Sequence, residues 1–203
     1  MEVRELSVPG AFEVTPVQHD DERGSFVEWF REDVFTERTG HPLRLAQANV
    51  SVSAVGALRG IHFAQLPPGQ AKFVTCLHGA AFDVVIDLRT GSPSYGLWDA
   101  VVLDDRDRRA VYLPEGVGHA FLALAENTIV SYLCSAPYAP GREHAIHPLD
   151  PEIAIAWPTT ARDGSPLIPL LSAKDQAAPL LAAVRDQGLL PSYAEARAFT
   201  DSL

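Results

Sequence analysis

Cysteine is scarce in this sequence, which has only Cys76 and Cys134 among its 203 residues. Each lies inside an apolar, strand-like run, and this placement favours reduced core thiols over a disulfide framework or a thiolate metal site. Long hydrophobic runs are missing too, so no segment reaches the length of a membrane-spanning helix. Because the amino terminus also lacks the basic and apolar regions of a signal peptide, we expect a cytoplasmic protein.

Positive charge is also in short supply. The chain carries 16 Lys and Arg residues against 26 Asp and Glu residues, which gives a formal net charge of -10. A field of this sign repels nucleic acid and anionic membranes, so we expect neither as a partner, and any anionic ligand must be held by local arginines. The hydrophobic fraction of 47% is ordinary for a folded protein, and at this length residues 1–203 fit a single domain.

Short β-type runs separated by turn residues recur along the chain, and this rhythm predicts a sandwich or barrel. The runs cover residues 12–17, 25–30, 45–53, 73–77, 82–88, 97–103, 111–113 and 128–134. Helical periodicity is confined to 31–39, to 176–187 with Gly188 as its stop, and to a shorter stretch from Ser192. We therefore predict an all-β barrel with short C-terminal helices, whose lumen is lined by alternate side chains and offers a natural ligand site.

The first candidate for chemistry is the segment that holds Arg59, Gly60 and His62. In a regular strand, residues three apart point to opposite faces, so Arg59 and His62 would point away from each other. A bulge at Gly60 would turn both side chains toward one cavity. The alternative is a structural histidine beside a surface arginine.

Three further polar residues lie in strand-like runs, with two interpretations each. Lys72 opens its run and is either a solvated strand end or, in a closed cavity, a cation that stabilises an oxyanion. His119 lies between small residues and is either a ligand contact or a capped core histidine. Tyr132 shares a face with Val130 and Cys134, so it is either a core aromatic or a phenol aimed into the lumen.

A metal site is the next question, because double-stranded β-helix proteins often hold an ion with a His-x-His pair, a glutamate and a later histidine. Phe63 and Ala64 follow His62, so this pair is broken. His62 and His119 make a poor site for a first-row metal without a supporting carboxylate or a third histidine. We expect no metal.

Ten short motifs, such as DERGSF at 21–26 and LRGIH at 58–62, run in order along almost the whole chain. The others lie at 47–51, 68–72, 83–89, 91–93, 114–121, 138–140, 150–153 and 171–175. Together they resemble the dTDP-4-dehydrorhamnose 3,5-epimerase family. The resemblance implies a double-stranded β-helix (cupin, jelly-roll) barrel that epimerises a dTDP-4-keto-6-deoxyhexose, such as dTDP-4-keto-6-deoxyglucose, without a cofactor.

The resemblance also implies roles for individual residues. His62 would be the base that removes a proton next to the ketone, with Asp175 as the carboxylate that orients it. Lys72 would stabilise the enolate oxygen, and Tyr132 would deliver a proton to the opposite face. Eight substrate contacts are implied as well: Arg23, Phe26, Glu28, Gln47, Asn49, Arg59, His119 and Tyr138.

Within this set, the three most N-terminal residues would reach in from the partner subunit of a homodimer, and the two arginines would hold the diphosphate. The two amide side chains and Tyr138 would serve the sugar or the thymine. His119 would line the sugar pocket with Asp83 behind it.

The chemistry makes sense on physical grounds too. A C4 ketone acidifies the hydrogens on C3 and C5, because the carbanion delocalises into an enolate that a nearby cation stabilises. Inversion then needs a base and an acid on opposite faces, and no redox cofactor. Differences from the family's usual motifs, among them residues 144–147, are typical of a branch that makes unusual deoxysugars for secondary metabolism, including antibiotics. Three alternatives stay open: inversion of only C3 or only C5, a metal-dependent enzyme of the same fold, and a non-catalytic sugar-nucleotide binding protein.

Overall fold

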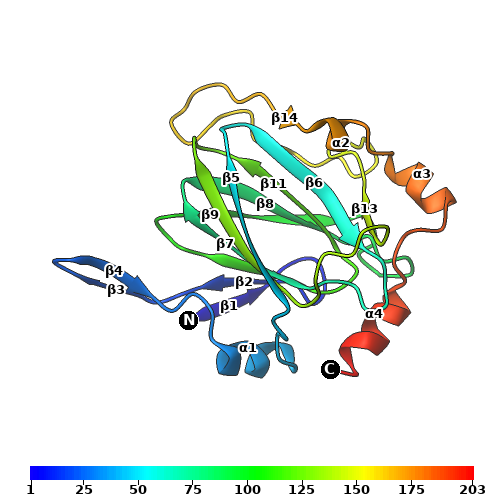
Figure 1. The fold of residues 1–203 in the computed structure, drawn as a ribbon, viewed down its shortest axis with the longest axis horizontal. Coiled ribbons are helices and arrows are strands. Elements are labelled where there is room, and N and C mark those ends of the chain that lie inside the picture. The colour runs from blue at the N-terminus through cyan, green and yellow to red at the C-terminus, as the bar shows by residue number, and fades with distance from the viewer.

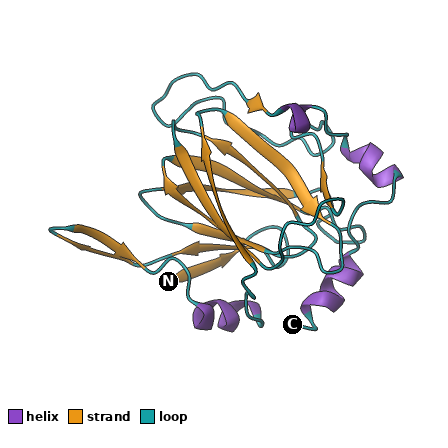
Figure 2. Cartoon of the chain, in the orientation of Figure 1, coloured by secondary structure: helices purple, strands orange, loops and turns teal.

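Strands make up most of the regular structure in this computed structural model, which describes residues 1–203 (Figure 1, Figure 2). The strands are β1 (Glu2–Glu5), β2 (Phe12–Thr15), β3 (Gln18–Asp21), β4 (Gly24–Val27), β5 (Gln47–Ser53), β6 (Ala57–Ala64), β7 (Lys72–His78), β8 (Ala80–Ile86), β9 (Trp98–Asp104), β10 (Ala110–Leu113), β11 (Gly118–Ala123), β12 (Thr128–Cys134), β13 (Glu143–Ala145) and β14 (Leu170–Leu171). The helices are α1 (Glu32–Thr39), α2 (Ala173–Gln176), α3 (Leu181–Asp186) and α4 (Tyr193–Thr200). None of them is long and apolar enough to cross a membrane.

The strands form two main sheets that combine distant parts of the sequence. One sheet has the order β1-β2-β10-β7-β12-β5, and the other has the order β13-β6-β11-β8-β9. The neighbours in both orders are antiparallel, whereas β14 runs parallel to β6 at its edge. Two antiparallel sheets packed face to face are the jelly-roll arrangement, so the predicted all-β barrel with short C-terminal helices is confirmed.

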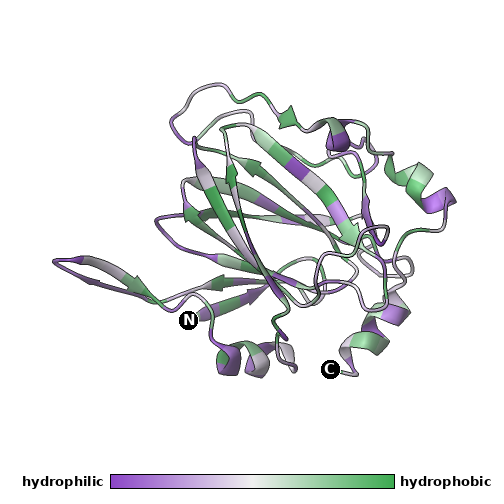
Figure 3. Cartoon of the chain, in the orientation of Figure 1, coloured by the Kyte–Doolittle hydropathy of each residue, from purple (hydrophilic) through white to green (hydrophobic).

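Alternation along the strands decides what lies between the sheets. Val85 of β8 points into the interior, where it joins Val130 of the opposite sheet in the main core cluster. Val84 points outward, where α3 covers the sheet. The alternation predicted for 82–88 is therefore present, and its partly polar face is the barrel interior, where Asp83 is fully buried. Figure 3 shows the same pattern in β6, whose hydrophobic stretch is interrupted by hydrophilic positions.

Most predicted strands are present, and the shifts at their ends have local causes. The run predicted over 12–17 ends at Thr15, because Pro16 has no N–H to donate to a neighbouring strand. The run predicted over 25–30 ends at Val27, and Trp29 turns onto the aromatic cluster around Phe73. The predicted runs leave out β1, β3, β13 and β14, whose side chains are mostly exposed or half-buried and show no alternation. They also leave out β6 and β11, which the sequence indicated only as the strand-like surroundings of His62 and His119.

The prediction of one helix over 176–187 is wrong. The chain forms α2 and α3, separated by a short segment that contains Pro179. Proline lacks an N–H and disfavours a helical conformation in the residue before it, so the helix cannot continue through this point. The helices predicted over 31–39 and from Ser192 are confirmed as α1 and α4, and the Ser192 side chain caps α4 by accepting a hydrogen bond from the N–H of Glu195.

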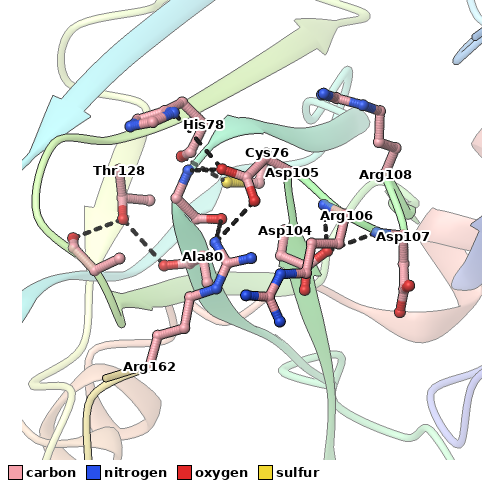
Figure 4. A network of polar contacts seen from close by, with 12 residues as sticks. Cys76, His78, Ala80, Asp104, Asp105, Arg106, Asp107, Arg108, Thr128 and Arg162 are labelled. Carbon is pink, nitrogen blue, oxygen red and sulfur yellow. Dashed lines mark hydrogen bonds and ion pairs between the residues drawn. The ribbon is translucent and has the colours of Figure 1, made fainter. Parts of the chain in front are cut away.

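A polar network around Asp105 links the turns at one end of the barrel (Figure 4). The Asp105 carboxylate accepts hydrogen bonds from the Gly79 amide, in the turn between β7 and β8, and from Arg162, both at 2.8 Å. The Thr128 hydroxyl lies within hydrogen-bond distance of the Ala80 and Ala125 carbonyl oxygens. This network fixes the turns at the end of the barrel that β7 reaches last, whereas Lys72 starts β7 at the other end.

The β3–β4 hairpin projects away from both main sheets (Figure 1). Its strands pair only with each other. Phe26 is 67% exposed, and the side chain of Arg23 is 84% exposed. The hairpin therefore carries Arg23 and Phe26, with Glu28 just beyond it, away from the interior of their own barrel.

Candidate active site

A cavity of about 550 Å³ contains every predicted catalytic residue. Strands β7 and β12 of the first sheet supply Lys72 and Tyr132. Strand β6 of the second sheet supplies His62, and α2 supplies Asp175. The cavity is thus lined from two facing sheets, with imidazole on one wall and ammonium and phenol on the other.

A β-bulge in β6 brings Arg59 and His62 to the same cavity. His62 pairs with His119 of β11, whereas Arg59 pairs with Phe121, so three steps along β6 oppose two steps along β11. Gly60 lies in the bulge with a φ of 112°, and a Cβ there would lie 2.5 Å from the carbonyl oxygen of His119. Only glycine tolerates both this conformation and this close approach. The predicted bulge is present, and both side chains line the cavity.

His62 forms a His–Asp pair with Asp175. The distance from Nε2 of His62 to Oδ1 of Asp175 is 2.7 Å, and the two side chains are 38% and 6% exposed. Burial raises the pKa of the Asp175 carboxyl, but hydrogen bonds from His62 and Ser172 outweigh burial, so this pKa lies below its ordinary value. Asp175 is therefore an anion at neutral pH and can only accept. This places the proton of neutral His62 on Nε2 and leaves the lone pair on Nδ1 as the basic atom.

His119 forms a second pair, with Asp83 of β8. The distance from Nε2 of His119 to Oδ2 of Asp83 is 2.8 Å, and both side chains are buried. The other carboxylate oxygen, Oδ1, has no hydrogen-bond partner in the protein. The structure thus places Asp83 behind His119, as the resemblance implied, and His119 next to His62 on the same wall.

Lys72 and Tyr132 lie on the inward face of neighbouring strands, where Lys72 pairs with Cys134, two residues beyond Tyr132. Burial lowers the pKa of the Lys72 ammonium group, against the opposing influence of Cys134, Glu143 and Asp83. Burial also raises the pKa of the Tyr132 phenol. Tyr132 therefore keeps its proton at neutral pH, which is the state that a proton donor needs.

Gln47, Asn49 and Tyr138 form a hydrogen-bonded chain beside Tyr132 but do not line the cavity itself. The backbone N–H of Tyr138 donates to Oε1 of Gln47, and the Gln47 amide donates to Oδ1 of Asn49, both at 2.8 Å. Asn49 is the direct cross-strand partner of Tyr132. The chain fixes the Asn49 side chain opposite Tyr132, and Gln47 lies two residues away, opposite Cys134.

Arg23, Phe26 and Glu28 are not brought to the cavity of their own subunit. Arg23 pairs with Asp21 inside the hairpin, and Glu28 lies 3.7 Å from Arg31. None of the three lines the cavity.

Several lining residues were missed by the sequence reasoning: Ser51, Ala57, Leu58, Phe121, Leu170, Leu171, Ser172 and Lys174. Ser172 was detectable, because serine three residues before an acidic residue has the spacing of a helix capping motif. It caps α2 by accepting a hydrogen bond from the N–H of Asp175. Lys174 could also have been predicted from the sequence as a lining residue, since it directly precedes Asp175 in the motif at 171–175.

The histidines do not make up a metal centre. No group of three or more His, Cys, Asp and Glu side chains is placed to hold an ion. Each imidazole instead has a carboxylate of its own at hydrogen-bond distance. This donor set does not fit the metal sites of the metal-dependent enzymes that share this architecture.

Comparison with known proteins identifies the family of this chain. The profile of the dTDP-4-dehydrorhamnose 3,5-epimerase family matches residues 5–183. A dTDP-4-dehydrorhamnose 3-epimerase from Streptomyces niveus is 56% identical over 200 residues, covering 98% of this chain and 93% of that protein. A dTDP-4-dehydrorhamnose 3,5-epimerase from Mycolicibacterium smegmatis is 54% identical over 203 residues, covering 100% and 97%. The crystal structure of a 3′-monoepimerase from Streptomyces bikiniensis, in complex with dTDP-quinovose, has a TM-score of 0.91 at 48% identity and covers 97% of this chain and 96% of its own. The chain therefore belongs to the dTDP-4-dehydrorhamnose 3,5-epimerase family of isomerases.

Proposed function

We propose that this protein epimerises a dTDP-4-keto-6-deoxyhexose, with dTDP-4-keto-6-deoxyglucose as its substrate, at one or both carbons next to the C4 ketone. One observation carries the proposal: His62, paired with Asp175 of α2, lies on one sheet of the cavity, and Tyr132 and Lys72 lie on the facing sheet. A sugar ring held between them meets a base on one face and an acid on the other, as inversion requires.

In the first step His62 removes the proton. The Nδ1 lone pair takes the hydrogen of the carbon next to the ketone, and the electron pair of the C–H bond moves onto the C4 oxygen to give an enolate. Asp175, 2.7 Å from Nε2, stabilises the imidazolium that forms. The Lys72 ammonium stabilises the enolate oxygen. The oxidation state of the substrate does not change, so the reaction needs no redox cofactor.

In the second step Tyr132 returns a proton to the opposite face. The phenol gives its proton to the carbon as the ketone re-forms, and this inverts the centre. Solvent then reprotonates the Tyr132 phenolate and accepts the extra proton from His62, whose side chain is 38% exposed. The enzyme is thereby restored for the next turnover.

Nucleotide binding falls to the remaining predicted residues. Arg59 lines the cavity and suits the diphosphate, because a guanidinium matches the geometry of phosphate oxygens. We assign the Gln47 and Asn49 amides and Tyr138 to the sugar and thymine groups, because their hydrogen-bonded chain lies beside Tyr132, which lines the cavity. We assign His119 to the sugar, because it lines the cavity as the cross-strand partner of His62.

The active form that we propose is a homodimer in which the β3–β4 hairpin supplies Arg23, Phe26 and Glu28 to the partner's cavity. The projecting hairpin supports this, and so does the exposed apolar face of the edge strand β5, where Val50 is 63% and Val52 is 60% exposed. Arg23→Ala should lower kcat/KM without changing the fold, and light scattering should report a dimer. A fully active monomer would contradict this assembly.

We also propose that residues 1–203 act as one domain in the cytoplasm, where the free thiols of Cys76 and Cys134 match a reducing environment. The carbon that is inverted defines two forms of the proposal. The family description and the Mycolicibacterium relative name a 3,5-epimerase, whereas the Streptomyces niveus relative is a 3-epimerase at nearly the same identity. Sequence identity therefore does not choose between them.

Incubation with dTDP-4-keto-6-deoxyglucose in deuterated water tests the proposal. We expect deuterium at C3 of the product, and at C5 as well if both centres are inverted, as read by mass spectrometry and NMR. A chelator should leave the rate unchanged, and His62→Asn should lose exchange while it still binds dTDP. Tight binding of the sugar nucleotide with no label at either carbon would favour a binding protein and refute the epimerase.

A further inference from the structure

Ser172 makes two hydrogen bonds to Asp175 that together fix its carboxylate. The Ser172 hydroxyl donates to Oδ2 at 2.8 Å, and the N–H of Asp175 donates to Oγ of Ser172 at 3.1 Å. Because the N–H occupies a lone pair of Oγ, the hydroxyl proton is directed at the carboxylate. The two bonds close a ring that sets the rotation of the Asp175 side chain, while its other oxygen holds His62.

We propose that Ser172 is a positioning residue of the epimerase, the outer member of a Ser172–Asp175–His62 relay that aims the base and sets its proton affinity. The inference rests on the proposed function of the site. It gives Ser172 a task beyond the capping of α2, because the same hydroxyl that caps the helix also binds the catalytic carboxylate.

Burial of Asp175 increases the effect of losing the hydrogen bond from Ser172. The Asp175 side chain is only 6% exposed, so water does not readily replace a missing donor. With the hydroxyl present, the carboxylate charge is shared between two donors, and the Ser172 hydrogen bond helps to lower the pKa of Asp175. Without it, charge concentrates on the oxygen that faces His62, and the imidazole holds its proton more tightly. The carboxylate is also freer to rotate, so the base is less well aimed.

The other ionisable groups around His62 come from every wall of the cavity: Arg59 on β6, His119 on β11, Lys72 on β7, Tyr132 on β12, Glu143 on β13 and Lys174 on α2. Replacement of Ser172 by alanine leaves all of these groups in place. A change in the titration of His62 in this variant is therefore due to the lost hydroxyl.

The test compares Ser172→Ala, Ser172→Thr and Ser192→Ala. For Ser172→Ala we expect kcat about 10-fold lower with KM nearly unchanged, and an acidic limb of kcat/KM about half a pH unit higher. Ser172→Thr keeps the hydroxyl and should restore both values. Ser192 caps α4 in the same way but touches no catalytic group, so Ser192→Ala reports the loss of a helix cap alone.

NMR titration of the His62 imidazole separates the relay from the proposed function. If the wild-type enzyme exchanges no deuterium, the epimerase proposal fails, while a raised His62 pKa in Ser172→Ala still supports the relay. An unchanged His62 pKa together with wild-type kcat in Ser172→Ala would overturn the relay. Equal losses of Tm and activity in Ser172→Ala and Ser192→Ala would also overturn it, because they would show that Ser172 acts only by capping its helix.

Discussion

Replacing Tyr132 by phenylalanine separates the two half-reactions of this site. Tyr132 packs against the interior core, and phenylalanine keeps that packing while removing only the hydroxyl. Deprotonation needs His62, Asp175 and Lys72, all of which lie on other elements, so enolate formation should continue. The donor on the second face of the ring is lost.

The size of the loss follows from the role of the acid and from access to the cavity. A positioned general acid contributes about 10²–10⁴ in rate, and water that enters a cavity of about 550 Å³ partly replaces it. We therefore expect epimer formation in Tyr132→Phe to fall by about 10²–10³. Exchange into recovered substrate should fall by less than about threefold. The reason is that the His62 side chain is 38% exposed, so its imidazolium exchanges the abstracted proton for deuterium from the solvent before it protonates the same carbon again.

The assay runs Tyr132→Phe in deuterated water and compares deuterium in unchanged substrate with the yield of epimer. Tyr112→Phe is the control, because the Tyr112 hydroxyl is buried without a hydrogen-bond partner and is not part of this cavity. Normal epimer yield in Tyr132→Phe would show that another group is the acid. Loss of exchange as complete as in His62→Asn would show that Tyr132 takes part in deprotonation.

Three further changes test other parts of the site. Asp175→Asn removes the charge that stabilises the His62 imidazolium and should lower kcat by on the order of 10²–10⁴ with dTDP binding retained; a loss below tenfold in the exchange assay would contradict the pairing. Activity should fall as rising pH deprotonates Lys72, and because burial lowers the pKa of Lys72, this alkaline limb should lie below the ordinary lysine value. Lys72→Arg stays charged and should abolish the limb, so a limb that persists at the same pH in this variant belongs to another group. Gly60→Ala should destabilise the fold by about 2–4 kcal/mol in urea unfolding, from backbone strain and a clash with β11. Gly91 has a φ of 83° and nothing within 4 Å of an added Cβ, so Gly91→Ala should lower the free energy of unfolding clearly less. Equal losses of stability in the two variants would show that the clash with β11 does not contribute.

Strand parity made much of the site predictable. Side chains alternate along a strand, so Tyr132 and Cys134 had to share a face whatever the fold. The same rule showed that Arg59 and His62 could meet only through an irregularity, and Gly60 marked where it lies. These are local steric statements, and the structure agrees with them because β12 and β7 pair without a break from Val130 and Cys76 to Cys134 and Lys72, and their register shifts only between Ile129 and Val130.

The helical tail was harder to predict from its pattern. Apolar residues over 176–187 fit a helix, but Pro179 outweighs periodicity, and the chain splits into α2 and α3. The break matters for the site, because it leaves α2 as a single short turn that holds Asp175 next to His62.

By itself, the sequence determined the β-rich architecture, the parity of the polar residues along each strand and, through the order of its motifs, the family. The resemblance implied that Asp175 orients His62 and that Arg23 serves a partner subunit, but only the tertiary structure shows the His62–Asp175 contact across 113 residues and the hairpin that carries Arg23 away from its own barrel. The hydrogen bond from Ser172 to Asp175 was found from the tertiary structure alone. The physical reason is that parity follows from the backbone of a few neighbouring residues. Which face is buried, and which distant side chains share it, depends on how both sheets pack around one interior.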